Sequence, residues 1–520
     1  MTGRPPPRGA ATGSRLGTLG PVASDSEPRD GVGLADLVER LTAEGLTLRA
    51  TGDLGVRVTG ATLDSRRVSP GDLYAALPGA HGHGASYWPQ ARDAGALAVL
   101  TDDEGAAGID GGVPVVVVPA VRPVLGRVCA LVYDEPARDL RMVGVTGTQG
   151  KTTTTRLLET GLTDAGIPSG VVGTVGTRML GEDVASALTT PEAPDLQRLF
   201  RRMADRGVEA CAMEVSSHAL VMHRVDGFAF DVAVFLNLGR DHLDFHRDMD
   251  DYFAAKASLF ETDHARQGLV SVDDDWGARL VRQAGVPVQT LSTQHPDADW
   301  WVDRVDLAPV GASFRIHGPD LEVAAGCPIP GEFNVANTLA AVAAAATAGY
   351  DAQAVATAIA AGPGVPGRLE RVDQGQDFVV VVDYAHKPDA LAAAIGTLRP
   401  LTEGRLIVVL GAGGDRDPGK RPLMGRIAAD GADVLVVTDD NPRSEDPAAI
   451  RKAILDGTTG GHAEVVEIGD RRAAIADAVR RAGAGDVVLV AGKGHETGQE
   501  VAGVLHPFDD REVARAVLGR

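Results

Sequence analysis

The segment Gly144–Thr153 constrains the fold of this chain more than any other. It reads Gly-Val-Thr-Gly-Thr-Gln-Gly-Lys-Thr-Thr, follows the apolar run Met142–Val145 and leads into a helical pattern from about Lys151. Strand, glycine-rich turn and helix open many nucleotide-binding α/β domains, because glycines let backbone N–H groups cradle phosphates. Lys151 would then reach the β and γ phosphates, and the Thr152 hydroxyl would sit on Mg²⁺. The alternative is an ordinary glycine-rich turn, because a valine occupies the first glycine position of the strict phosphate-loop pattern.

The length of 520 residues suggests about three domains. Residues 1–33 are rich in Pro, Gly, Arg and Ser and lack an apolar core segment, which predicts a disordered tail and not a signal peptide. Linkers are expected at Asp134–Arg138 and Gly362–Gly367. The predicted domains are therefore 34–137, 138–363 and 364–520.

The last predicted domain contains short apolar runs that alternate with helical segments, which indicates a parallel sheet buried on both faces. These runs are Phe378–Val382, Leu406–Leu410, Val434–Val437 and Val487–Val490. Earlier in the chain, Val113–Pro119 predicts a strand and Asn334–Ala361 an alanine-rich helical region. The expected fold class is α/β throughout: an N-terminal α/β domain, a central P-loop-type domain with a mainly parallel sheet, and a Rossmann-like C-terminal domain.

The chain is strongly acidic, with 50 basic and 71 acidic residues and a net charge of −21. Nucleic acid and anionic membrane surfaces are therefore not expected as partners. The three cysteines are isolated and have no metal-binding spacing, which favours a reducing compartment, and we expect a cytoplasmic location. No run of about 18 apolar residues predicts a membrane span.

Two residues are candidates for the chemistry from their surroundings alone. Glu214 ends an apolar stretch, where a carboxylate near a phosphate loop could bind Mg²⁺, although a lone glutamate there is more often a helix N-terminal residue. Lys256 falls at helical spacing on a face with Tyr252, Phe253, Leu259 and Phe260. Burial would lower its pKa, and a neutral amine can react with CO₂ to form a carbamate. Spacing alone favours the alternative, a lysine whose head reaches water.

The glycine-rich segment Gly411–Arg421 follows a predicted strand at the carboxyl end of the parallel sheet, where ligands bind. Arg416, Lys420 and Arg421 would place positive charge there, as an acidic protein with an anionic substrate requires. The alternative is a solvated turn.

Several motifs, in the same order along the chain, resemble those of the Mur ligase family. They are Thr-Gly-Thr-x-Gly-Lys-Thr-Thr, in which Gln149 replaces the usual asparagine, and the segments Glu214–His218, Gly331–Asn337, Pro366–Glu370 and Val382–Pro388. The resemblance covers nearly everything from about residue 32 to the C-terminus.

The resemblance implies an ATP site and two Mg²⁺ ions. The implied ATP-binding residues are Gly147, Thr148, Gln149, Gly150, Lys151, Thr152, Thr153, Asn337, Arg368, Asp383 and Tyr384. The implied metal ligands are Thr152, Glu214, His242 of the segment Asn237–His246, and Lys256 as a carbamate; Lys151, Lys256, His242 and Glu214 are the implied catalytic residues. Two alternatives remain open: the histidines could belong to a polar loop, and Asn334 could be a helix N-cap.

The resemblance also implies a UDP-linked substrate. Leu63–Arg66 and Gly71–Tyr74 resemble the family's UDP-binding domain, with Leu63 and Ser65 at the uridine, whereas Ala80–Gly82 departs from the family's composition. The implied ligands of the muramoyl peptide are Thr189, Thr190, Ser216 and Arg224. Met222 stands where a polar residue is expected, so no contact is assigned to it.

The third domain resembles that of the members that add diaminopimelate. Asp440–Arg443 resembles their recognition motif, and lysine-adding members lack its arginine; Gly492–Glu496 also matches. The implied meso-diaminopimelate site comprises Arg416, Asp440, Asn441, Pro442, Arg443, Gly492 and Glu496.

The implied function is that of an ATP-dependent ligase, expected as a monomer, which adds meso-diaminopimelate to UDP-N-acetylmuramoyl-L-alanyl-D-glutamate through an acyl phosphate. Closure of the third domain would exclude water from that intermediate. The alternatives are a lysine-adding ligase, a folate polyglutamate ligase, which the N-terminal UDP-type domain argues against, and a P-loop switch protein.

Overall fold

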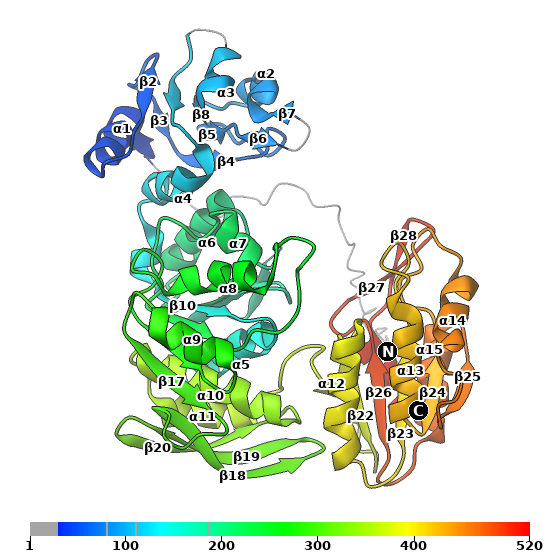
Figure 1. Ribbon diagram of the computed structural model, residues 1–520. Coiled ribbons are helices and arrows are strands. Elements are labelled where there is room, and N and C mark those ends of the chain that lie inside the picture. The colour runs from blue at the N-terminus through cyan, green and yellow to red at the C-terminus, as the bar shows by residue number, and fades with distance from the viewer. Residues whose placement is uncertain (1–29, 80–81, 110–111, 185–187, 520) are drawn as a thin grey trace, which may run out of the picture. The chain divides into compact units, whose positions relative to one another are not determined.

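The structure is a computed structural model that describes residues 30–79, 82–109, 112–184 and 188–519 (Figure 1). Its contacts divide the chain into two units, Met1–Val121 and Arg122–Arg520. Most of the expected N-terminal tail, residues 1–29, lies outside the described residues, while Val32–Gly33 forms strand β1.

The first unit contains a five-stranded sheet in the order β2-β9-β8-β5-β4, in which only β2 is antiparallel to its neighbour. The predicted strand at Val113–Pro119 is confirmed as β9. The elements are β1 (Val32–Gly33), α1 (Leu34–Ala43), β2 (Arg49–Thr51), β3 (Arg57–Val58), β4 (Gly60–Thr62), β5 (Asp72–Ala75), β6 (Pro78–Gly79), β7 (Gly82–His83), η1 (Gly84–Tyr87), α2 (Trp88–Asp93), β8 (Ala98–Thr101), α3 (Asp103–Ala107) and β9 (Val115–Val117).

The central part of the second unit is built on an eleven-stranded sheet in the order β13-β12-β11-β14-β10-β15-β16-β17-β18-β19-β20. Strands β11 to β18 of this order run parallel, and antiparallel strands extend both edges. The strands are β10 (Arg141–Thr146), β11 (Ser169–Val172), β12 (Thr177–Met179), β13 (Glu182–Val184), β14 (Ala210–Glu214), β15 (Val232–Phe235), β16 (Gly268–Ser271), β17 (Val288–Ser292), β18 (Trp300–Ala308), β19 (Gly311–Gly318) and β20 (Leu321–Cys327).

Helices cover this sheet, and the predicted strand, turn and helix around the glycine-rich segment are confirmed as β10 and α5. The alanine-rich region forms two helices, α10 and α11, and both pack on α5. The helices are α4 (Val121–Val132), η2 (Pro136–Asp139), α5 (Lys151–Asp164), α6 (Ala193–Asp205), α7 (Ser217–Val221), α8 (Met249–Ala257), η3 (Ser258–Phe260), α9 (Asp275–Gln283), α10 (Glu332–Thr347) and α11 (Ala352–Ala361).

The C-terminal part contains the predicted parallel sheet, in the order β21-β22-β26-β23-β24-β25, with β21 alone antiparallel. A hairpin of β27 and β28 follows its last strand. The elements are β21 (Glu370–Arg371), β22 (Val379–Asp383), α12 (Pro388–Leu398), η4 (Arg399–Leu401), β23 (Leu406–Leu410), α13 (Lys420–Gly431), β24 (Val434–Val437), α14 (Pro447–Asp456), β25 (Glu464–Glu467), α15 (Arg471–Arg481), β26 (Val487–Ala491), β27 (Gly498–Val501), β28 (Val504–Pro507) and α16 (Asp510–Leu518).

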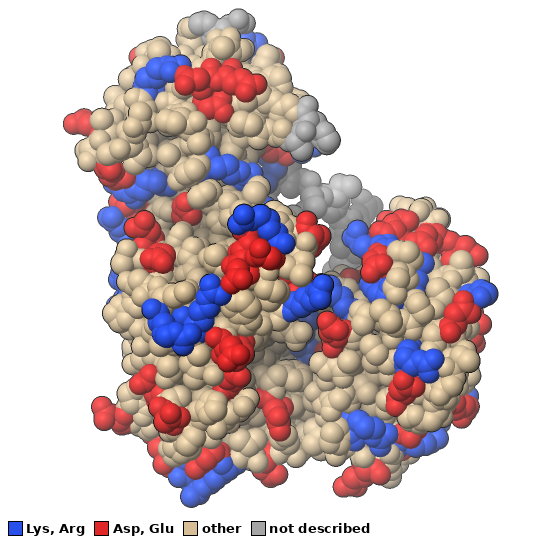
Figure 2. Space-filling view, viewed as in Figure 1, with Lys and Arg blue, Asp and Glu red and all other residues tan. Residues whose placement is uncertain are grey.

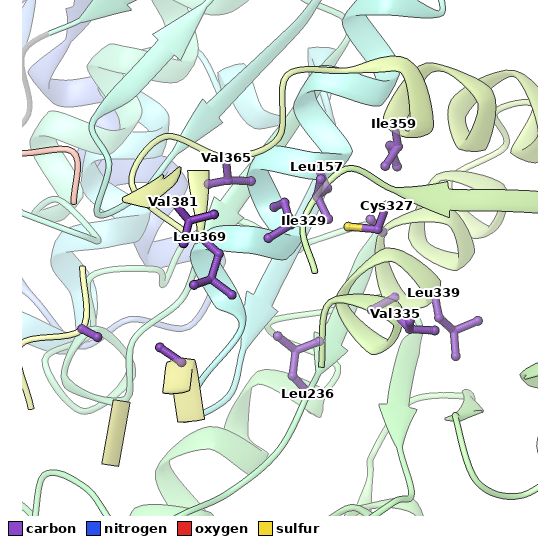
Figure 3. Close-up of a cluster of buried hydrophobic side chains, with 14 of the residues drawn as sticks. Leu157, Leu236, Cys327, Ile329, Val335, Leu339, Ile359, Val365, Leu369 and Val381 are labelled. Atoms are coloured by element: carbon purple, nitrogen blue, oxygen red, sulfur yellow. The ribbon is translucent and has the colours of Figure 1, made fainter. Parts of the chain in front are cut away.

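One large apolar cluster packs around α5, the helix that follows the glycine-rich segment (Figure 3). It contains Leu157 of α5, Leu339 of α10 and Ile359 of α11, all nearly inaccessible to solvent. Alanine predominates on α10, and its small side chain lets α5 and α10 approach closely. This packing gives α5 a rigid base, so that its N-terminus can hold a charged ligand.

Charged side chains of both signs are interspersed on the face shown in Figure 2. Within the part of the chain that the structure describes, no helix is long and apolar enough to cross a membrane.

Candidate active site

The glycine-rich loop leaves the carboxyl end of β10, between the parallel strands β14 and β15. Gly147 and Gly150 have positive φ angles of 154° and 88°, which glycine adopts without strain, and α5 begins directly after Gly150. The Lys151 ammonium donates hydrogen bonds to the carbonyl oxygens of Gly147 (2.7 Å) and Thr148 (3.0 Å). The loop therefore has the helix N-terminus and the lysine of a phosphate-binding loop.

Asn237 holds this loop from the neighbouring strand end. Its carbonyl accepts a hydrogen bond from Thr148 N (3.0 Å), and its side-chain oxygen accepts one from Gln149 N (3.0 Å). Its side-chain nitrogen donates back to the Gln149 carbonyl (3.2 Å). Gln149 thus contributes its backbone to the loop. Sequence reasoning gave Asn237 no role, although it opens a segment that had been singled out.

Glu214 is buried at the carboxyl end of β14 and accepts three hydrogen bonds. Its Oε2 accepts from the hydroxyls of Thr152 (3.0 Å) and Thr174 (3.1 Å), and its Oε1 accepts from Thr174 N (2.7 Å). The reading of Glu214 as a helix N-terminal residue is wrong, because Ser216 caps the next helix, α7. Thr153 lies buried in the first turn of α5, beside Thr152.

The pair of Thr152 and Glu214 suits a magnesium ion. A hydroxyl and a carboxylate on adjacent strand and loop ends are the protein ligands that Mg²⁺ takes in P-loop enzymes, with phosphate oxygens and water completing the shell. Among the described residues, no three His, Cys, Asp or Glu side chains are grouped to hold a metal by themselves. The donor set therefore fits an ion that shares its ligands with a nucleotide.

Lys256 is 1% exposed and lies with Tyr252 and Phe253 on the buried face of α8. Its ammonium donates to the Gly147 carbonyl (2.8 Å) and lies 4.7 Å from the centre of the Tyr252 ring. Burial, together with the charge of nearby Lys151, lowers its pKa well below the ordinary value. The reading in which its head reaches water is wrong, and the amine is placed beside the phosphate loop in an environment that favours its neutral form.

His242 belongs to an aromatic cluster near Lys256. Its ring centre lies 6.0 Å from that of Tyr252 and 4.9 Å from that of His218, which stacks on Phe245. Desolvation lowers the His242 pKa. The side chain is 40% exposed, so a neutral imidazole remains open to a ligand. The cluster places His242 near Lys256, with Tyr252 close to both.

A cavity of about 410 Å³ adjoins the loop and has the size of a small-molecule site. All predicted ATP-binding residues except Gly147 line it: Thr148, Gln149, Gly150, Lys151, Thr152, Thr153, Asn337, Arg368, Asp383 and Tyr384. Sequence reasoning missed part of the lining, namely Ser271, Asp273, Ser292, Thr293, Phe333, Asp241 and Lys387. The last two form an ion pair at 3.5 Å, and both lie inside segments that had been singled out.

Asn337 lies one turn inside α10 and faces the phosphate loop. Its side-chain oxygen accepts a hydrogen bond from Thr154 (3.3 Å), and its side-chain nitrogen donates to Asn334 (3.1 Å). Asn334 donates to the carbonyl of Pro330 (2.8 Å) from within the helix, and the N-cap residue is Gly331. The reading of Asn334 as an N-cap is therefore wrong.

Arg368, Asp383 and Tyr384 form one group at the carboxyl end of β22. The Arg368 guanidinium lies 5.0 Å from the centre of the Tyr384 ring. The Asp383 carboxylate accepts from the backbone of Leu369 and Ala385, both at 2.8 Å. Burial raises the pKa of Asp383, against the opposing effect of Arg368. These bonds hold the loop that presents Arg368 and Tyr384 to the cavity.

The predicted amino-acid site gathers at the carboxyl ends of β23, β24 and β26. Arg443 is 22% exposed on its side chain, donates from Nη1 to the Gly414 carbonyl (2.6 Å) and lies 3.3 Å, through Nε, from Glu500. Its Nη2 has no hydrogen-bond partner among the described residues. The reading of Gly411–Arg421 as a solvated turn holds for Arg416, which is exposed.

Arg421 does not supply the free positive charge that was expected of it. It is buried and donates to both oxygens of Glu445, at 2.8 and 2.9 Å, so a carboxylate neutralises it. Lys420 is half-buried and donates to the carbonyl of His386 (2.8 Å). Arg416 and Arg443 remain the cations of this loop group that can meet a ligand.

The segment Asp440–Pro442 lies beside Gly492 and Glu496, as expected if the two segments belong to one amino-acid site. Asn441 donates to Glu496 at 2.8 Å. A side chain at Gly492 would meet the Asp440 carboxylate at 2.6 Å, which explains the glycine there. The two segments, about fifty residues apart, thus form one polar site.

The predicted ligands of the muramoyl peptide surround the end of β14. The Thr190 hydroxyl donates to the Glu214 carbonyl (2.8 Å), and Thr189 is 3.0 Å from Thr174 through their hydroxyls. Ser216 accepts from Ala219 N as the cap of α7. Arg224 donates to the Thr190 carbonyl (3.2 Å). The structure therefore brings Thr189, Thr190, Ser216 and Arg224 together.

The predicted uridine contacts lie in the first unit. Leu63 is half-buried after β4, and the buried Ser65 donates to the side chain of Gln90 (2.8 Å). Ala80 and His81, in the segment that departs from the family's composition, lie outside the described residues.

Comparison with known families and proteins agrees with this geometry. Residues 57–133 match the model described as "Mur ligase family, catalytic domain", residues 145–345 the "Mur ligase middle domain" and residues 367–494 the "Mur ligase, glutamate ligase domain". UDP-N-acetylmuramoyl-L-alanyl-D-glutamate–2,6-diaminopimelate ligase of Streptomyces coelicolor is 53% identical over 93% of this chain and 96% of its own length. The Corynebacterium glutamicum ligase of the same name is 49% identical over 93% and 96%.

A solved structure of a ligase with that name superposes with a TM-score of 0.68 at 35% identity, covering 89% of this chain and 95% of its own. A folylpolyglutamate synthase of Mycobacterium tuberculosis superposes with a TM-score of 0.57 at 20% identity, covering 77% and 96%, and shares the fold.

Proposed function

The chain belongs to the Mur ligase family, and on that premise we propose that it joins meso-2,6-diaminopimelate to UDP-N-acetylmuramoyl-L-alanyl-D-glutamate with consumption of ATP. The observation that carries the proposal is the identity of more than half of its residues to the Streptomyces ligase of that name, over nearly the full length of both chains. The reaction forms a peptide bond in a peptidoglycan precursor. Because the reaction consumes ATP, we place the protein in the cytoplasm.

The first step takes place at the phosphate loop. The terminal carboxylate of the substrate attacks the γ-phosphorus of ATP, ADP leaves, and an acyl phosphate forms. Lys151 now donates to two loop carbonyls, and its reach allows it to turn toward the γ-phosphate. Charge grows on the transferring phosphoryl group, so the lysine and the α5 N-terminus stabilise the transition state more than the ground state.

Thr152, Glu214, His242 and Lys256 are proposed to hold Mg²⁺, which would neutralise phosphate charge when bound. Lys256 contributes an anionic oxygen only after its neutral amine has taken up CO₂ as a carbamate. The burial that lowers its pKa supplies that neutral amine.

The second step requires an amine and the exclusion of water. The amine of diaminopimelate attacks the acyl carbon, phosphate leaves, and an amide forms. Thr189, Thr190, Ser216 and Arg224 are proposed to hold the muramoyl peptide beside Glu214, so that its carboxylate lies next to the γ-phosphate. The loops after β23, β24 and β26 are proposed to bind the amino acid.

Arg443 is proposed to select the amino acid. Diaminopimelate has a distal carboxylate that lysine lacks, and a guanidinium can bind a carboxylate through two parallel hydrogen bonds. The Arg443 Nη2 is unpaired among the described residues, which leaves it available. A site of this kind can discriminate by about 10⁴-fold, because it leaves part of the guanidinium, here Nη2, without an acceptor when the carboxylate is missing.

Phosphate release by the purified protein tests the proposal. We expect release only when ATP, Mg²⁺, the UDP-muramoyl dipeptide and meso-diaminopimelate are all present, and far slower release when L-lysine replaces diaminopimelate. A preference for lysine would overturn the choice of amino acid and leave the ligase reaction intact. Release of phosphate without the UDP substrate would overturn the ligase assignment itself.

A further inference from the structure

Lys493 is a lysine with no exposure to solvent, in the loop that follows β26. Lysine is almost never fully buried unless it is paired, because its charge loses the hydration of water. The Lys493 ammonium donates to Glu496 Oε2 (2.9 Å) and to Asn441 Oδ1 (3.0 Å), and it lies 3.9 Å from the Asp440 carboxylate. Lys493 thus links the loops after β24 and β26 from within.

We propose that Lys493 is a positioning residue of the amino-acid site: it orients the Glu496 carboxylate so that one oxygen is held by the protein and the other faces the ammonium group of the substrate. This inference rests on the proposed function and assigns to that site a residue that does not itself touch the substrate.

The hydrogen bonds of Glu496 are divided unequally between its two oxygens. Oε2 accepts from both Lys493 and Asn441. Oε1 has no hydrogen-bond donor among the described residues, although the side chain is only partly exposed. A carboxylate oxygen that is fixed in place and lacks a donor can accept from an ammonium group, and diaminopimelate carries one beside its distal carboxylate.

Asn441 takes part in the same support. Its amide nitrogen donates to Glu496, and its oxygen accepts from Lys493 and from the backbone of Glu500 (3.0 Å). Glu500 also lies beside Arg443. The amide is therefore engaged on both ends, and Asn441 acts by holding Glu496 and the loop that carries Arg443.

The charges of the cluster match a zwitterion. Asp440, Glu496 and Glu500 carry three negative charges, and Lys493 and Arg443 carry two positive charges, so one negative charge is not balanced within the cluster. The Oε1 atom of Glu496 and the Arg443 guanidinium lie on two loops that contact each other through Asn441. This arrangement is complementary to the ammonium and carboxylate at the distal end of diaminopimelate, whereas the distal end of lysine carries only the ammonium.

Kinetics of Lys493→Met test the inference, since methionine matches the length of lysine without its charge. We expect the KM for meso-diaminopimelate to rise at least tenfold, while the KM values for ATP and the UDP substrate stay within twofold of wild type. Glu496→Gln should cause a similar loss. The double variant Lys493→Met/Glu496→Gln should be no worse than the poorer single variant, because Lys493 acts through Glu496.

The pH dependence of kcat/KM for meso-diaminopimelate separates a positioning role of Lys493 from a purely structural one. The groups around Glu496 are Lys493 and His495 of its own loop, Asp440 after β24, Tyr384 after β22 and Arg471 of α15. Burial raises the Glu496 pKa, and Lys493, with smaller contributions from Asn441 and His495, more than offsets this, so that the pKa is lowered. Without Lys493, only Asn441 and His495 oppose the effect of burial, so the Glu496 pKa is higher than in the wild type.

In Lys493→Met, kcat/KM for meso-diaminopimelate should therefore rise with pH through a group that is absent from the wild-type profile. That group should vanish in the double variant. Arg405→Met is the matched control, because it breaks an ion pair with Asp486 (2.9 Å) at the opposite end of β26. It should lower the midpoint of thermal unfolding without changing the KM for diaminopimelate or its pH profile.

The outcomes distinguish the two proposals. If the wild type does not use meso-diaminopimelate, the proposed function fails. If the wild type uses it while Lys493→Met keeps its KM within twofold, or loses activity equally toward all three substrates with no new group in the pH profile, Lys493 has no positioning role.

Discussion

At Lys256, the requirements of chemistry and of stability oppose each other. A buried ammonium costs folding free energy, and its partners are the Gly147 carbonyl, the Thr146 hydroxyl at 3.5 Å and the face of Tyr252. Lys151 also donates to that carbonyl, so loss of the Lys256 amine does not leave it unpaired. Lys256→Met should therefore stabilise the unmodified protein, by about 1 kcal/mol, while it abolishes ligation.

The difference in unfolding free energy between Lys256→Met and the wild type should become smaller as the pH rises. Because burial lowers the Lys256 pKa, the unfolded chain binds more protons than the folded chain between that lowered pKa and about 10.5. Wild-type stability should rise with pH across this window, and the advantage of Lys256→Met should shrink. Denaturant unfolding of both proteins in CO₂-free buffer, from pH 7 to pH 10, measures this. A wild type that is more stable than the variant at pH 7 would contradict it.

The carbamate makes a separate prediction for activity. Depletion of bicarbonate should lower wild-type turnover, and restoring it should recover the loss. Short carboxylic acids should partly rescue Lys256→Ala, because their carboxylate can occupy the place of the carbamate. Steady-state turnover with and without added acetate measures the rescue. Wild-type turnover by the unrescued alanine variant would remove Lys256 from the mechanism.

Sequence patterns predicted single residues well where one element decides their surroundings. The helical spacing around Lys256 was enough to place it on an apolar face. The role of Asn334 and the neutralisation of Arg421 were missed, because each depends on a neighbour that sequence spacing does not reveal. Arg421 meets Glu445 from the next loop of the sheet, and Asn334 lies inside a helix that begins two residues earlier, at Glu332.

The glycines that flank α5, Gly150 and Gly166, provide a test at the level of one element. Gly150 precedes the helix with φ 88°, and an added Cβ would lie 2.4 Å from the Asn337 side chain. Gly166 follows the helix with φ 87°, and nothing lies within 4 Å of its added Cβ. Alanine at either position should cost about 1–2 kcal/mol of stability from the left-handed backbone. Gly150→Ala alone should also raise the KM for ATP, at least tenfold.

Gly166→Ala is thus the control for backbone strain without a clash in the cavity. The comparison requires thermal unfolding and ATP kinetics of both variants. An unchanged KM for ATP in Gly150→Ala, or an equal rise in both variants, would show that the N-terminus of α5 does not bind the phosphates.

The arrangement of the elements was partly predictable. Apolar β-branched runs identified the parallel strands of the C-terminal sheet, because a strand buried on both faces requires them. The antiparallel strands β18–β20, which extend the central sheet, were not anticipated, since their half-exposed pattern is weaker. The alanine-rich region was predicted as one stretch, and it divides where Gly349 has φ 95° and Asp351 caps α11.

For the whole molecule, the two steps of the proposed reaction depend on different sets of residues. The phosphate loop and Glu214 serve the first step, and the loops after β23, β24 and β26 serve the second. Lys151→Ala should therefore slow formation of the acyl phosphate, with a smaller effect on nucleotide binding. Arg443→Ala should form the acyl phosphate at the wild-type rate and be slow only in its conversion to the amide.

Single-turnover experiments without an amino acid, with hydroxylamine to trap the acyl phosphate, isolate the first step. Adding meso-diaminopimelate then reports the second. Arg443→Ala should lose most of its kcat/KM for diaminopimelate, and the preference for diaminopimelate over lysine should shrink. The variant has no guanidinium to bind the distal carboxylate, and none that lacks an acceptor when lysine is bound. If acyl phosphate forms at the normal rate in Lys151→Ala, the phosphate-loop assignment is wrong. If Arg443→Ala keeps the wild-type ratio of kcat/KM between the two amino acids, Arg443 does not recognise the distal carboxylate. Other residues of these loops must then select the amino acid.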